Sequence, residues 1–256
     1  MVMKVLPEVV DTGVADALRR EFAVLASLSH PRIARVFDFG KRPAGTRFLP
    51  QDQPLEHPRM FFTRELIVGA DLSAFAHKSV AETAALLADV ARLLDILHTA
   101  GVVHGDLKPA NVIVDPLGVP HLIDFGLAVR MSAKQEGTAQ GGTRSHIAPE
   151  AWQGGVIDGR ADLYALGVIL CQTISGRNVR TSEQARRALG GQPRAVVELA
   201  VRLLAASPDE RMATASEAAA ALDALAGRGG DVSSRATVND ASRPGGAGPR
   251  AGAPSA

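Results

Sequence analysis

Apolar residues in the first part of the chain fall into short runs that predict β-strands. Residues 1–6 form one run, which Pro7 ends, and residues 33–39 and 60–68 form two more. The intervening segment 41–59 contains four prolines and one glycine, so we expect an exposed loop between two paired strands.

Helical spacing is found between the first two of these strands and again after the third. Residues 16–27 place Leu18, Phe22 and Leu25 on one face, which predicts a helix between the first two strands. Residues 81–100 repeat the pattern over a longer stretch and predict an amphipathic helix. Further helices are expected over residues 163–174, 195–206 and 216–226.

Two short β-branched runs, residues 111–114 and 119–123, surround the turn sequence Asp-Pro-Leu-Gly and predict a small hairpin. After residue 226 the composition becomes rich in Gly, Pro, Ser and Ala without periodicity, which is typical of a disordered tail. The order of elements indicates an α+β fold, with a mainly helical second half.

The composition narrows the choice of partners only slightly. The chain has 256 residues, 46% of them hydrophobic, and a formal net charge of +1, so it favours neither nucleic acid nor an anionic membrane as a partner.

Its one cysteine, Cys171, lies in an apolar run, which predicts a buried structural thiol. Neither a signal peptide nor a membrane span is evident, so we expect a cytoplasmic location.

The strongest chemical signal is the segment His-Gly-Asp-Leu-Lys-Pro-Ala-Asn at residues 104–111. It leads into the predicted hairpin, which ends in Asp124-Phe125-Gly126. Phosphoryl transfer needs oxygen ligands for Mg²⁺, a group that orients the attacking hydroxyl, and positive charge near the phosphoryl oxygens. Asp106, Lys108, Asn111 and Asp124 supply this set of groups.

These two motifs resemble the catalytic loop and the metal motif of the protein kinase family. The resemblance implies that Asp106 orients the substrate hydroxyl and accepts its proton, and that Lys108 contacts the γ-phosphate of ATP. It implies that Asn111 and Asp124 bind Mg²⁺. His104 is expected to pack beneath the loop rather than to titrate.

Other residues of the second half fit the same family. Glu150, in Ala-Pro-Glu, is expected to form a buried ion pair with Arg211. Asp162 resembles the aspartate that anchors the catalytic loop through its backbone N–H groups, although a plain helix N-cap is the simpler interpretation. Thr143 and Lys108 favour serine/threonine over tyrosine specificity.

In the first half, Lys4 resembles the lysine that binds ATP, and Glu21 its helical partner. Glu65 and Ile67 would form the hinge, whose backbone groups hold the adenine edge. Arg64 falls near the back of the adenine pocket, where the family usually has an apolar side chain.

The resemblance implies a two-lobed kinase fold, with a partial N-lobe over residues 1–68, a C-lobe over 69–226 and a tail over 227–256. ATP would lie between the lobes. The reduced antiparallel N-lobe sheet lacks the two strands and the glycine-rich loop that normally precede the lysine, because only three residues come before Lys4. Either the chain is incomplete at its start, or another chain completes the sheet, or ATP binding is weak. We favour the first of these interpretations. Gly105 stands where regulated kinases carry an arginine.

We interpret the chain as a bacterial-type protein serine/threonine kinase that uses ATP and Mg²⁺ on a protein substrate. Two alternatives remain open. One is a kinase-like interaction module that binds ATP weakly or not at all. The other is a small-molecule phosphotransferase resembling aminoglycoside and choline kinases, which share His-Gly-Asp. The sequence does not define an oligomeric state.

Overall fold

The computed structural model describes residues 1–5, 19, 22–23, 25–47, 55–76, 78–124 and 143–228. Several sequence predictions fall outside these residues. They concern Glu21, the Phe-Gly pair at 125–126, half of the helix expected at 16–27, and the tail beyond residue 228.

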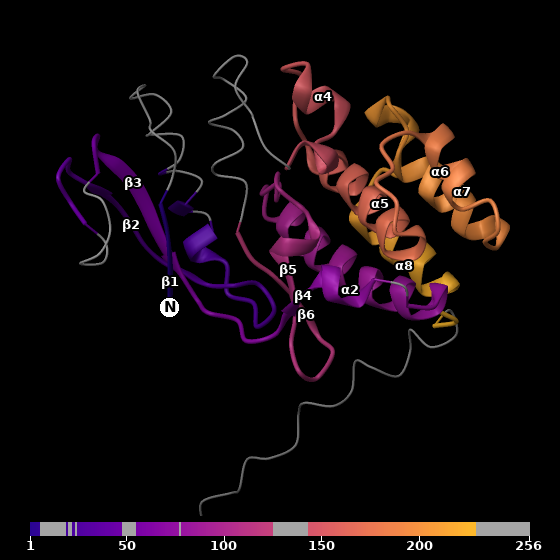
Figure 1. The fold of residues 1–256 in the computed structure, drawn as a ribbon, viewed down its shortest axis with the longest axis horizontal. Helices are drawn as coiled ribbons and strands as arrows, with labels where there is room; N and C mark the ends of the chain where they lie inside the picture. The colour runs from indigo at the N-terminus through magenta and orange to yellow at the C-terminus, as the bar shows by residue number, and fades with distance from the viewer. Residues whose placement is uncertain are drawn as a thin grey trace, which may run out of the picture.

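The first sheet consists of β1 (Val2–Val5), β2 (Val36–Arg42) and β3 (Arg59–Arg64), all antiparallel, in the order β1-β3-β2 (Figure 1). The central strand β3 buries Met60 and Phe62 against the core. The predicted strand pair is therefore present. The second strand continues past Gly40 to Arg42, so the connection to β3 is shorter than the loop predicted at 41–59.

A second sheet, in the order β4-β5-β6, belongs to the mainly helical part of the molecule. It contains β4 (Ala70–Asp71) and the predicted hairpin of β5 (Val112–Val114) and β6 (Pro120–Leu122). The helices that accompany it are α2 (Val80–Thr99), α4 (Pro149–Trp152), α5 (Gly159–Ser175), α6 (Ser182–Ala188), α7 (Arg194–Leu203) and α8 (Ala215–Leu225). The short helices α4 and α6 were not predicted.

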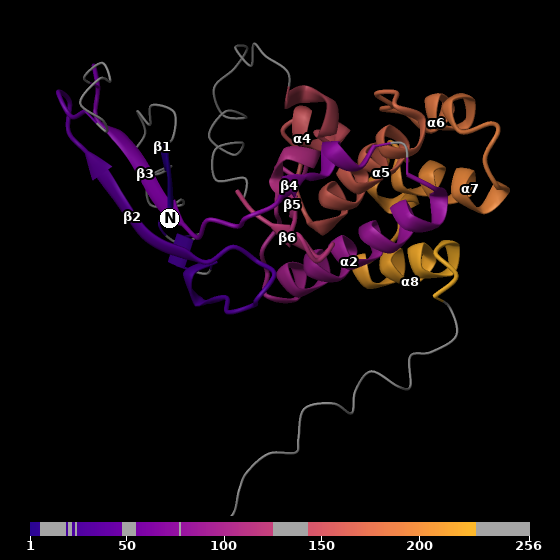
Figure 2. The ribbon, with the colours of Figure 1, turned by 60° about the horizontal axis from the view of Figure 1, so that its bottom comes forward.

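Helix α5 occupies the centre of the helical part, with α2, α7 and α8 packed around it (Figure 2). Its residues from Ala161 to Cys171 are all buried, as expected for a helix that is covered on every side. Burial raises the pKa of the Cys171 thiol to about 12, so this cysteine is the structural thiol that the sequence predicted. None of the helices in the described ranges has the length and apolar character needed to cross a membrane.

The part that contains the first sheet is joined to the mainly helical part close to the predicted metal motif. The segment before β2 runs beside β6, where Ala34 N–H donates to the Leu122 carbonyl at 2.9 Å and Leu122 N–H donates to the Arg32 carbonyl at 2.9 Å. Asp124 follows Leu122 by two residues. These backbone hydrogen bonds therefore fix the first sheet relative to Asp124.

We predict that Gly69→Ala destabilises the fold, because a Cβ at this position would lie 2.2 Å from the Val114 carbonyl oxygen. The backbone of β5 must shift to relieve this overlap, at a cost of about 1–3 kcal/mol of unfolding free energy. Chemical denaturation measures the change. Gly191→Ala is the matched control, because a Cβ added at Gly191 would have no atom within 4 Å other than those of the residue itself and its chain neighbours. Equal stability of the two variants would contradict the prediction.

Candidate active site

The structure brings together the three polar side chains predicted for the catalytic loop. Lys108 Nζ lies 2.7 Å from Asp106 Oδ2, and Asn111 Nδ2 donates to the same oxygen at 3.0 Å and to the Asp106 carbonyl at 2.8 Å. Asn111 is buried at the end of a 3₁₀ turn, Pro109–Asn111, whose first position is the proline. Lys108 and Asn111, at the two ends of this turn, therefore both contact Asp106 Oδ2.

Asp124 reaches the same cluster through its backbone. Asn111 Nδ2 lies 3.3 Å from the Asp124 carbonyl oxygen, and Ile123 N–H donates to the Asn111 carbonyl at 3.0 Å. Asp124 has a φ of 55°, a left-handed conformation that is rare for residues other than glycine and that concentrates at functional sites. Hydrogen bonds thus connect the backbone at Asp124 to the catalytic loop.

His104 is fully buried beneath the loop, as predicted. Its Nε2 lies 3.2 Å from the Ile123 carbonyl, which makes Nε2 the protonated nitrogen, and Nδ1 accepts from Asp106 N–H at 3.4 Å. Burial lowers the pKa of His104 and favours the neutral ring. The histidine therefore connects the loop to the end of the hairpin without carrying charge.

Asp162 anchors the catalytic loop. Its side chain is only 2% exposed. The carboxylate accepts His104 N–H at 2.8 Å and Gly105 N–H at 2.9 Å, and lies 2.8 Å from His98 Nε2. The simpler interpretation as a helix cap is wrong, because the N-cap of α5 is Asp158, whose side chain accepts from Arg160 N–H. A buried carboxylate needs such donors, so these contacts account for its position.

In the first sheet, Lys4 and Arg64 both point to Asp124. Lys4 Nζ lies 3.5 Å from Asp124 Oδ2, and Arg64 Nε lies 2.6 Å from Oδ1. Of the residues predicted to form the hinge, Glu65 is exposed and Ile67 is half-buried. Since Glu21 lies outside the described residues, its predicted pairing with Lys4 stays a prediction.

The ion pair between Arg64 and Asp124 was missed by sequence reasoning. The sequence did identify Arg64 as unusual at the back of the adenine pocket. It carried no signal that the side chain would reach Asp124, which is 60 positions away along the chain.

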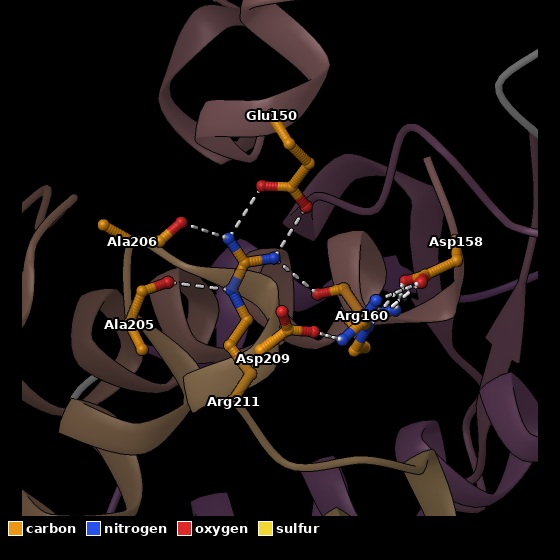
Figure 3. Close-up of polar contacts among 7 residues, drawn as sticks. All are labelled: Glu150, Asp158, Arg160, Ala205, Ala206, Asp209 and Arg211. Carbon is orange, nitrogen blue, oxygen red and sulfur yellow. Dashed lines mark hydrogen bonds and ion pairs between the residues drawn. The ribbon is translucent and has the colours of Figure 1, made fainter. Parts of the chain in front are cut away.

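Glu150 and Arg211 form the predicted ion pair (Figure 3). Arg211 Nη1 and Nη2 lie 2.7 and 2.8 Å from the two carboxylate oxygens, and the side chain of Arg211 has no exposed surface. The guanidinium also donates to the backbone carbonyls of Ala205, Ala206 and Arg160. The pair thus attaches α4 to the segment after α7 and to the start of α5.

The side-chain oxygens of Asn111 and Asp124 suit a Mg²⁺ ion that is bound together with a nucleotide. The Asn111 amide turns its Nδ2 toward carbonyl oxygens, which leaves Oδ1 as the side-chain oxygen for a ligand, and Asp124 supplies a carboxylate already surrounded by cations. No cluster of three or more His, Cys, Asp or Glu residues able to hold a metal occurs in the part of the chain that the structure describes. Mg²⁺ typically needs only one or two protein ligands when phosphates and water supply the rest.

Comparison with known proteins defines the class of this fold and site. The sequence model of the protein kinase domain matches residues 1–239, so the chain belongs to the protein kinase family. The two-lobed fold is confirmed by the kinase domain of PknI from Mycobacterium tuberculosis. That structure gives a TM-score of 0.65 at 25% identity and covers 87% of this chain and 84% of its own.

Bacterial serine/threonine-protein kinases are among its curated relatives. The DNA damage-responsive kinase RqkA of Deinococcus radiodurans is 33% identical over 182 residues, which are 68% of this chain and 25% of RqkA. PknA of Mycobacterium tuberculosis is 31% identical over 65% of this chain and 38% of its own length. The chain thus spans well under half the length of these relatives.

We predict that Arg211→Met lowers the unfolding free energy by about 3–5 kcal/mol, because it leaves the Glu150 carboxylate without its partner in a largely buried position. Thermal or chemical denaturation measures this loss. Arg194→Met is the control, since Arg194 also pairs with a glutamate but its side chain is 91% exposed. A loss no larger than that of the control would show that the Glu150 pair contributes little to stability.

Proposed function

We propose that the chain is a protein serine/threonine kinase that transfers the γ-phosphate of ATP to a hydroxyl group of a protein. One observation carries the proposal: Asp106, Lys108, Asn111 and the backbone of Asp124 form a single hydrogen-bonded cluster. A hydroxyl acceptor and a phosphate donor can be held together by such a cluster of carboxylate, ammonium and amide groups.

In the proposed reaction the substrate hydroxyl oxygen forms a bond to the γ-phosphorus while the bond from that phosphorus to the β,γ-bridging oxygen breaks. ADP leaves, and the hydroxyl proton passes to a carboxylate oxygen of Asp106 and then to solvent. Lys108, 2.7 Å from Asp106 Oδ2, would offset negative charge on the transferred group. When bound by Asn111 and Asp124, Mg²⁺ would neutralise charge on the ATP phosphates.

The Glu150–Arg211 pair favours a protein kinase over a small-molecule phosphotransferase, because the resemblance that includes this pair is to the protein kinase lobe. We further propose the division into an N-lobe over residues 1–68 and a C-lobe over 69–226. The remaining alternative is an interaction module that does not bind nucleotide. A direct measurement of ATP binding distinguishes this alternative from a kinase.

We expect Asp106→Asn to reduce phosphate transfer from radiolabelled ATP to a generic acceptor protein by at least about a hundredfold, because the amide cannot accept the hydroxyl proton. Glu198→Gln, a carboxylate-to-amide change at an exposed position on α7, should leave the rate unchanged. Transfer that persists in Asp106→Asn would refute the role of Asp106.

Mg²⁺ and ATP together should raise the melting temperature of the chain if they bind the folded state. At an ATP concentration one hundred times the Kd, mass action adds about 2.7 kcal/mol to the unfolding free energy. Differential scanning fluorimetry with ATP, Mg²⁺, both or neither measures the effect. The absence of a shift at millimolar ATP would favour the interaction module.

A further inference from the structure

Arg64 is held in the middle of the predicted nucleotide site by two polar contacts. It is the last residue of β3, the central strand of the first sheet, and its side chain is only 11% exposed. Its Nε donates to Asp124 Oδ1 at 2.6 Å, and its Nη1 donates to the Glu65 carbonyl at 2.9 Å. Strand β3 thus fixes the backbone end of the side chain, while Asp124 and Glu65 fix the guanidinium.

Both contacts use oxygen atoms to which the proposed function gives another partner. The Asp124 carboxylate would bind Mg²⁺, and the Glu65 carbonyl belongs to the hinge that would hold the adenine edge. Lys4 lies against the second carboxylate oxygen of Asp124 at the longer distance of 3.5 Å. Arg64 is therefore the cation that contacts Asp124 at hydrogen-bond distance.

A magnesium ion and a guanidinium interfere at one carboxylate oxygen. Mg²⁺ requires its ligands at about 2.0–2.1 Å in near-octahedral geometry. A guanidinium bonded to the same oxygen would lie within a few ångströms of the ion, where two like charges repel strongly at a site with little solvent exposure. Coordination of the metal by Asp124 Oδ1 then requires the Arg64 side chain to leave this oxygen.

We propose that Arg64 competes internally with Mg²⁺ for Asp124, so that the Mg²⁺–nucleotide complex binds only after the guanidinium is displaced. The inference rests on the proposed function, because that function makes Asp124 a metal ligand. It assigns to Arg64 the role of setting the Mg²⁺ concentration at which nucleotide binds.

The test measures binding of a fluorescent ADP analogue to the full chain, as a function of Mg²⁺ and, separately, in EDTA. Arg64→Met, similar in length but uncharged, should lower the Mg²⁺ concentration for half-maximal binding by about tenfold, the effect of removing one charge-assisted hydrogen bond. Arg64→Gln should act in the same direction. Arg59→Met, at the other end of β3, should match the wild type. Circular dichroism checks the folding of each variant, and either Arg64 variant that folds suffices.

Each outcome decides the inference. A lower Mg²⁺ requirement in an Arg64 variant, with unchanged binding in Arg59→Met, supports it. An unchanged requirement overturns it while leaving the proposed function intact. Weaker Mg²⁺-dependent binding also overturns it, since Arg64 would then contact the nucleotide rather than exclude the metal. If no variant binds the analogue, with or without Mg²⁺, both the inference and the proposed function fail.

Discussion

The buried carboxylate of Asp162 is the constraint on which the candidate site depends. A carboxylate removed from water is stable only when donors surround it, and here the donors are the backbone N–H groups of His104 and Gly105 and the ring of His98. Two of these donors belong to the catalytic loop. The most buried helix, α5, therefore determines where that loop begins, and Asp106 follows Gly105 directly. Two residues further on, Lys108 lies beside Asp106.

A second constraint acts from the other side of the site. Hydrogen bonds between the segment before β2 and β6 hold the first sheet next to Asp124, which brings Lys4 and Arg64 to its carboxylate. The positive charges of Lys4 and Arg64 compensate the negative charge of the half-buried Asp124 carboxylate. A carboxylate that needs a compensating cation would also bind Mg²⁺, so the ion pair with Arg64 would oppose binding of the ion.

The sequence predicted the parts of this fold that follow from local patterns. The long helix α2 has a clear periodicity, the hairpin β5–β6 has a turn sequence, and the buried helix α5 contains an apolar run. Asp106, Lys108, Asn111 and Asp124 were found through two short motifs. The helices α4 and α6 were missed because they span 4 and 7 residues, too few for a periodic signal. Arg64 was noted as unusual, but its contact with Asp124 depends on how the two parts pack. Sequence spacing carries no information on that packing.

Gly105 shows how the loop is held without an arginine at this position. Its φ of 72° is a conformation that an arginine would adopt only with strain, and in this conformation its N–H donates to Asp162. The position thus contributes backbone geometry to the loop instead of a guanidinium. His104 N–H also donates to Asp162, and the His104 ring contacts the Ile123 carbonyl, so α5 and the hairpin both hold the loop.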